Sequence, residues 1–191
     1  LDIDGAMSYA MVWLNGELVG GWPYPYNSFR LDLTPHLRFH GENQLAIRLD
    51  NPVKSARWYP GAGLYRDVWL TKIDNVHIGH WGTHFTSRDI TAESATVDME
   101  IFLENRGESG SKIKVAIEVF ELDLDTGLPL GEAVATWDER ATIGSDAKKS
   151  VQHSLKIKNP KTWGPPPTQK PYLYLGVAKL ITEDGTEIDR Y

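Results

Sequence analysis

Apolar and polar side chains alternate with a period of two along most of this chain, and helical spacing of apolar residues is nearly absent. In the clearest run every second residue is apolar: Ala95, Val97, Met99, Ile101 and Leu103. The same alternation recurs over residues 113–119 and 151–157. Successive side chains of a strand point to opposite faces, so each run predicts a strand with one buried and one solvated face. The chain is therefore expected to be all-β.

Turn signals divide the predicted strands into two groups, residues 1–72 and residues 73–191. In the first group, Asn15-Gly16 separates two apolar runs, which is the pattern of a two-residue hairpin. Thr34-Pro35 suits the cap and first residue of one short helical turn. The second group has about seven strand signals, the number expected for a small antiparallel sandwich. The weaker of these signals lie at Val76–His80, Ala133–Trp137, Tyr172–Ile181 and Thr186–Arg190.

The composition limits the classes of function. No apolar run reaches the roughly 20 residues of a membrane-spanning helix, so membrane insertion is not expected. The net charge is −6 and no basic face is clustered, so nucleic acid is not an expected partner. The chain has no cysteine, which excludes disulfides and thiolate chemistry. It begins at Leu1 without the pattern of a secretory leader, and we expect a processed or excised piece.

Carboxylate pairs are the first candidates for acid–base chemistry. The close pairs in sequence are Asp2/Asp4, Asp123/Asp125 and Glu183/Asp184. Residues i and i+2 of a strand share a face at roughly 6–7 Å, which alone would permit joint action. The neighbouring glycines, however, favour turn chemistry, in which Asp stabilises the backbone. We interpret these residues as turn residues and expect no catalytic role for them.

Three histidines, His77, His80 and His84, lie close together and raise the question of a metal site. Residues i and i+3 of a strand point to opposite faces, so this spacing does not favour shared ligation. We therefore expect no metal and no other cofactor. The alternative interpretation of this segment is an interdomain linker that packs Trp81 and Phe85.

Aromatic residues crowd two proline-containing stretches and form the sharper candidate for binding. They are Trp22, Tyr24, Tyr26 and Phe29 in one stretch, and Trp58, Tyr59 and Tyr65 in the other. Exposed rings in loops are what saccharide sites use, because the C–H faces of sugars stack on them. Aromatic and proline residues also pack loops onto the ends of a sandwich, and this second interpretation is favoured for Trp22, Tyr59 and Trp69.

One segment has a more specific pattern. Residues 57–70 read Arg-Trp-Tyr-Pro-Gly-Ala-Gly-Leu-Tyr-Arg-Asp-Val-Trp-Leu. This resembles the junction that closes the N-terminal sugar-binding domain of glycoside hydrolase family 2 enzymes, especially their β-galactosidase-like members. Other segments resemble the family in the same order along the chain: Val12–Gly16, Phe29–Thr34, Gly41–Leu45, Asn159–Trp163 and Pro171–Tyr174.

The resemblance implies a partial jelly-roll sandwich over residues 1–72, followed by an immunoglobulin-like β-sandwich over residues 73–191. It further implies the non-catalytic N-terminal portion of a retaining exo-glycosidase that hydrolyses terminal β-glycosidic bonds. The catalytic glutamates of the family belong to a barrel domain, so no catalytic residue is expected here and the fragment should be inactive alone. The jelly roll lacks several strands, which would leave an open edge.

The implied partners are a β-galactoside or oligosaccharide, the catalytic barrel of the same polypeptide, and a second copy in a homo-oligomer. The loop from Asp50 to Trp58 would help to shape the sugar pocket, with Asn51, Arg57 and Trp58 as substrate-binding residues. The planar fork of Arg57 could bind a hydroxyl or a carboxylate.

Several alternatives stay open. The choice of galactoside rests on residues 57–70, since glucuronide and mannoside enzymes share the framework. A periplasmic or extracellular location is expected from the family, although the cytoplasm also fits the sequence. The other functional class is a free-standing carbohydrate-binding or adhesion module.

Overall fold

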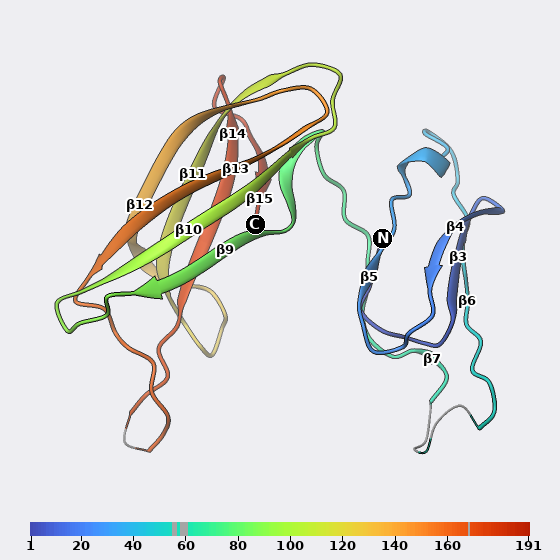
Figure 1. Ribbon diagram of the computed structural model, residues 1–191, viewed down its shortest axis with the longest axis horizontal. Helices are drawn as coiled ribbons and strands as arrows, with labels where there is room; N and C mark the ends of the chain where they lie inside the picture. The colour runs from blue at the N-terminus through green and yellow to red at the C-terminus, as the bar shows by residue number, and fades with distance from the viewer. Residues whose placement is uncertain (55–56, 58–60, 168) are drawn as a thin grey trace. The chain divides into compact units, whose positions relative to one another are not determined.

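The computed structural model describes residues 1–54, 57, 61–167 and 169–191, and these residues are almost entirely in strands and loops (Figure 1). The all-β prediction is confirmed. The only helical element in the described part of the chain is the 3-10 turn η1 (Thr34–His36). The chain separates into two compact units, Leu1–Lys72 and Ile73–Tyr191.

Short antiparallel strands build the first unit. They are β1 (Asp2–Ile3), β2 (Ala6–Met7), β3 (Ala10–Leu14), β4 (Glu17–Trp22), β5 (Phe29–Arg30), β6 (Leu45–Arg48), β7 (Gly63–Leu64) and β8 (Val68–Trp69). They form three sheets, in the orders β4-β3-β6, β5-β1-β8 and β2-β7. Alternation along β3 turns Ala10, Val12 and Leu14 inward, where they are buried in a small core with Leu1 and Ile3.

The predicted hairpin and helical turn both occur in this unit. Asn15 and Gly16 have φ angles of 55° and 87°, the positive values that a tight two-residue turn requires. The Asn15 side chain also donates a hydrogen bond of 2.9 Å to the carbonyl of His36, which ties the hairpin to η1. The prediction that Thr34 caps this turn is wrong. Its backbone N–H donates to Asp32 Oδ1 at 2.9 Å, so the aspartate supplies the acceptor.

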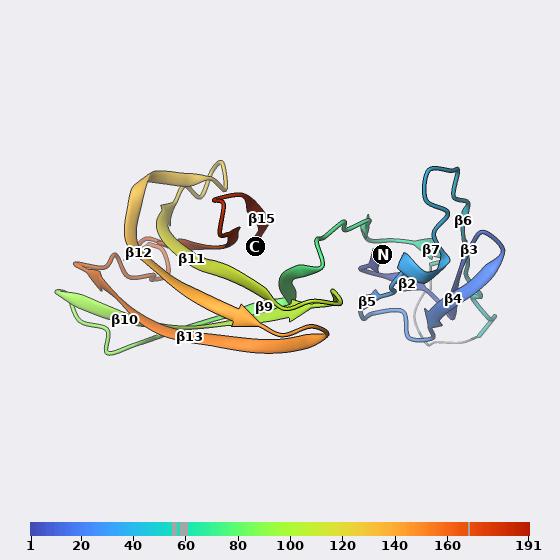
Figure 2. The same ribbon diagram turned by 90° about the horizontal axis from the view of Figure 1, so that it is seen from above.

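The second unit is a seven-stranded antiparallel sandwich of the immunoglobulin-like kind (Figures 1 and 2). Its strands are β9 (Val76–Arg88), β10 (Ser94–Asn105), β11 (Ser111–Leu122), β12 (Pro129–Ile143), β13 (Ala147–Lys158), β14 (Tyr174–Thr182) and β15 (Glu187–Arg190). One sheet has the order β13-β10-β9 and the other β12-β11-β14-β15. The inward residues of both sheets form one core, which includes Ile101, Leu103, Val115, Ile117 and Leu180.

Strand β9 corrects the interpretation of its histidine-rich segment as a linker. Val76–Arg88 is one strand along β10, in which Phe85 packs against the sandwich core and Trp81 is exposed. The strand is bulged, because Ile101 pairs with Thr83 while Leu103 pairs with Ile78. Four residues of β9 therefore lie opposite Phe102 alone. The bends inferred at Gly79 and Gly82 are confirmed by this bulge.

Candidate functional site

The loop predicted to reach the sugar pocket leaves the first unit from a fixed point at the end of β6. The backbone N–H of Asp50 donates to the carbonyl of Ser8 at 2.8 Å, and the Ser8 hydroxyl donates to the carbonyl of Asp50 at 2.7 Å. Ser8 itself is buried. Two hydrogen bonds to one buried residue define the position at which the loop begins.

The structure places two of the three predicted substrate-binding residues. Asn51 follows the clamped Asp50 and is half-buried, whereas Arg57 is exposed. Trp58 lies outside the described residues. Val53, between the two, is 91% exposed, so this part of the loop faces solvent. The loop therefore offers an amide close to its fixed base and a guanidinium further along the chain.

The aromatic stretch between β4 and β5 is more exposed than the packing interpretation requires. Trp22 is 42% exposed and Trp69 is 56% exposed, so the prediction that they pack the ends of a sandwich is wrong. Trp69 instead donates its indole N–H to Asp4 Oδ2 at 3.1 Å. Tyr59, the third residue of that prediction, lies outside the described residues. Tyr24 and Tyr26 meet edge to face, with ring centroids 5.5 Å apart.

Hydrogen bonds bring this aromatic stretch to the same edge of the first unit as the sugar-pocket loop. The N–H of Tyr9 donates to the carbonyl of Pro23 at 3.1 Å, and Tyr9 directly follows the Ser8 that holds Asp50. The Tyr65 hydroxyl donates to the carbonyl of Pro25 at 2.6 Å. Sequence reasoning missed Ser8 and Tyr9, because their partners are backbone groups of distant segments and carry no sequence signal.

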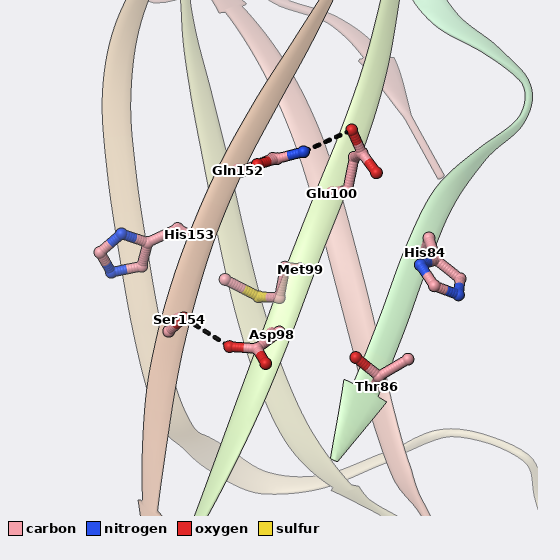
Figure 3. Close-up of a pocket in the computed structure, with 8 residues that line it drawn as sticks. All are labelled: His84, Thr86, Asp98, Met99, Glu100, Gln152, His153 and Ser154. Carbon is pink, nitrogen blue, oxygen red and sulfur yellow. Dashed lines mark hydrogen bonds between the residues drawn. The ribbon is translucent and has the colours of Figure 1, made fainter. Parts of the chain in front are cut away.

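The second unit has a shallow concavity of about 370 Å³ on the outer face of the sheet β13-β10-β9 (Figure 3). Its polar residues come in two rows across the strands. Asp98 lies opposite Thr86 and Ser154, and Glu100 lies opposite His84 and Gln152. Figure 3 shows the Ser154 and Gln152 side chains directed toward these carboxylates.

Both carboxylates in this concavity already have partners within the sheet. Asp98 accepts hydrogen bonds from Arg88 Nε at 2.6 Å and from the Ser154 hydroxyl, and these donors hold its pKa below the usual range. Glu100 Oε1 accepts from Ser150 and Gln152, each at 2.7 Å, which likewise lowers its pKa. The pair is thus kept ionised, which is unsuitable for a general acid at neutral pH.

The lowered pKa of Asp98 predicts a dependence of stability on pH. A carboxyl whose pKa is lower in the folded state stabilises above its unfolded pKa, and that contribution is lost as the pH falls through the folded value. We expect the unfolding midpoint of Asp98→Asn to fall less than that of the wild type between neutral pH and about pH 3. Denaturant titrations at both pH values measure this difference, which should be small because the pair is exposed. Ser154→Ala, which removes one donor, should behave intermediately, and parallel pH responses of all three proteins would contradict the prediction.

The carboxylate pairs singled out in the sequence have structural partners. Asp123 Oδ1 accepts from the N–H groups of Asp125 and Thr126, and Asp184 Oδ1 accepts from the N–H of Thr186, which confirms both as turn residues. Asp2 is different, because it lies in β1 and pairs with Arg30. Partial burial opposes the ionisation of Asp2, but the hydrogen bonds and charge of Arg30 outweigh it and lower the pKa.

The three histidines do not converge. His77 is buried with its Nδ1 3.0 Å from the carbonyl of Asp74, His80 stacks on Trp81, and His84 borders the concavity. Across the described ranges, no three side chains of His, Cys, Asp or Glu are grouped as metal ligands. No helix among the described residues has the length and apolarity needed to cross a bilayer.

Known proteins share both the sequence and the fold of this chain. The sequence pattern of the family described as Glycosyl hydrolases family 2 matches residues 76–191. The chain belongs to glycosyl hydrolase family 2. The match covers the entire β9–β15 sandwich, whereas the segments whose resemblance predicted the family lie largely in the first unit.

Relatives within glycosyl hydrolase family 2 match this chain over its whole length. It is 32% identical to β-galactosidase BoGH2A of Bacteroides ovatus, covering 100% of this chain and 21% of that enzyme. It is 27% identical to a β-glucuronidase of Formosa agariphila, covering 100% of this chain and 20% of that enzyme. A crystal structure of a family 2 member from Bacteroides cellulosilyticus matches with a TM-score of 0.87 and 30% identity, over 100% of this chain and 25% of that one. The chain thus spans about a fifth of the length of its curated relatives.

Proposed function

We propose that this chain is a non-catalytic portion of a retaining exo-glycosidase that removes terminal β-galactosyl residues. Its two units support a catalytic barrel in the same polypeptide, and the loop that starts at Asp50 contributes to the sugar pocket. The observation that carries the proposal is the match of the whole chain to a fifth of a β-galactosidase. Hydrolysis itself would be performed by residues beyond these 191.

The carboxylates of the chain support the non-catalytic assignment. A retaining glycosidase needs two carboxyl groups about 5 Å apart, one of them with a raised pKa so that it can donate a proton. The row pair Asp98 and Glu100 has lowered pKa values and is occupied by donors from its own sheet. Asp123 and Asp184 are engaged in turns. These groups stabilise the sandwich.

Arg57 and Asn51 have the chemistry to recognise a sugar. The guanidinium of Arg57 is exposed and offers several N–H donors in one plane, which suits vicinal hydroxyls as well as a carboxylate. The clamp between Asp50 and Ser8 fixes the base of the loop, so less ordering is needed when a sugar binds. We assign Arg57, Asn51 and Trp58 to substrate binding.

Arg57→Ala in the full-length protein tests this assignment. We expect kcat/KM for an aryl β-galactoside to fall roughly tenfold to a hundredfold, because a charged hydrogen bond to substrate is lost. Arg38→Ala is the matched control, since Arg38 is an exposed arginine bonded to Asn43 beside the β3–β4 turn, away from this loop. Unchanged kinetics of Arg57→Ala would remove Arg57 from the pocket.

The same assay distinguishes the alternatives. The 191-residue chain alone should not hydrolyse the aryl glycoside, and activity that survives rigorous purification would contradict the non-catalytic assignment. Parallel assays of the full-length protein with aryl β-galactoside and aryl β-glucuronide decide between the activities named for its relatives. Lack of turnover of both would favour the carbohydrate-binding or adhesion module instead.

A further inference from the structure

Four tyrosines form an exposed group at the edge of the first unit from which the sugar-pocket loop begins. Tyr9, Tyr24, Tyr26 and Tyr65 are each between 41% and 54% exposed. We call these four residues the tyrosine surface. They come from the start of β3, from the stretch between β4 and β5, and from the residue after β7. Segments far apart in the sequence therefore supply rings to one edge.

The tyrosine surface is held by hydrogen bonds to its own backbone. Tyr9 donates its N–H to Pro23, and Tyr65 donates its hydroxyl to Pro25, so both contacts hold the stretch that carries Tyr24 and Tyr26. The ring of Tyr65 lies against Gly5, where a Cβ would come within 2.7 Å of Cζ. Rings fixed in this way lose little conformational entropy when they bind a ligand.

The chemistry of this edge is aromatic and uncharged. No charged residue occurs between Leu18 and Phe29, and the polar residues after Tyr26 are the exposed Asn27 and Ser28. Flat rings flanked by neutral amides and hydroxyls suit the apolar C–H faces and the hydroxyl rims of pyranose sugars. A surface built to bind a protein through hydrophobic burial would favour aliphatic side chains as well.

Ser8 joins the tyrosine surface to the loop assigned to the sugar pocket. Its hydroxyl and carbonyl hold Asp50, and the next residue, Tyr9, belongs to the surface and holds Pro23. The two elements are thus connected through adjacent residues. A saccharide that enters the pocket with its terminal sugar could extend its following sugars along this edge.

We infer that the tyrosine surface binds the sugars of an oligosaccharide substrate that follow the terminal residue to be removed. This inference rests on the proposed function and adds to it the substrate class, an oligosaccharide in place of a small glycoside. The rings contribute by stacking, while Arg57 and its neighbours recognise the terminal sugar. The surface binds; it takes no part in bond cleavage.

The test compares two substrates in the full-length enzyme. For the double variant Tyr24→Ala/Tyr26→Ala, we expect kcat/KM on a β-linked galacto-oligosaccharide to fall about fivefold to tenfold, the scale of lost ring stacking. The kcat/KM on an aryl β-galactoside should stay unchanged. Tyr24→Phe/Tyr26→Phe keeps the rings and should retain most of the activity on the oligosaccharide.

Phe39→Ala is the matched control, because Phe39 is 71% exposed and lies near the Asn43 side chain that binds Asn15, at the opposite end of the β3–β4 hairpin. It should change neither rate. Equal losses on both substrates together with a lower melting temperature would mean that the rings pack against another part of the protein, and would overturn the inference. Unchanged rates on both substrates would overturn it as well.

Failure of the proposed function would look different, because the wild-type protein would then hydrolyse neither aryl glycoside. Calorimetric titration of the wild-type full-length protein with the oligosaccharide then decides the inference directly. Binding that is lost in Tyr24→Ala/Tyr26→Ala and kept in Phe39→Ala would support it. The same affinity in all three proteins, or no affinity in the wild type, would reject it.

Discussion

Leu103→Ala should lower the free energy of unfolding of the sandwich by about 3–4 kcal/mol. Leu103 is fully buried on β10 and belongs to the core between the two sheets. Its β9 partner, Ile78, is buried as well. Removing the side chain forfeits its transfer from water and leaves a cavity that packed strands cannot close. Denaturant unfolding followed by fluorescence measures the difference.

Phe102→Ala is the matched control for this prediction. Phe102 is adjacent in the sequence but points to the outer face of the same strand, where it is 42% exposed. We expect it to cost about 1 kcal/mol or less, although the residue removed is larger. Equal losses for the two variants would mean that the sandwich core does not lie on the face assigned to Leu103.

Gly82→Ala is expected to have the second large effect, about 3 kcal/mol of lost stability. A Cβ at residue 82 would lie 2.4 Å from the carbonyl oxygen of Gly79 and 2.9 Å from its nitrogen. Both are backbone atoms within the β9 bulge, so no side chain can move aside to relieve the overlap.

Gly79→Ala provides the comparison within the same bulge. A Cβ there would first meet Glu104 Oε1 at 3.3 Å, which is an atom at the end of a flexible side chain. We expect its effect to be less than about 1 kcal/mol. Thermal unfolding of both variants should therefore separate them clearly, and similar melting temperatures would show that the bulge adapts its backbone.

The all-β fold was predictable because one physical signal dominates it. Alternation along residues 95–103 determines which side of β10 is buried, and Asn15-Gly16 allows only a tight turn. The bulge in β9 was not predictable in detail. Neighbouring glycines indicate a bend, but only pairing with β10 shows that the strand continues beyond it.

The candidate site was predictable only as a region. The family resemblance identified the loop that carries Asn51 and Arg57, because such motifs record chemistry along the chain. The clamp by Ser8 and the gathering of Tyr9, Tyr24 and Tyr65 depend on backbone contacts between distant segments. The packing prediction for Trp22 was wrong because composition cannot tell a ring that covers a core from one that faces water.

The pairing of β10 with β13 has a consequence during protein synthesis. Asn105 ends β10, yet the ribosome must continue to Lys158 before all of β13 exists, which takes roughly 3–10 s at usual elongation rates. Throughout that interval β10 has its neighbour β9 but an unpaired opposite side. Asp98, Glu100 and Glu104 place negative charges along the waiting strand. Nascent chains on one messenger RNA should therefore repel each other at the edge where they would otherwise join.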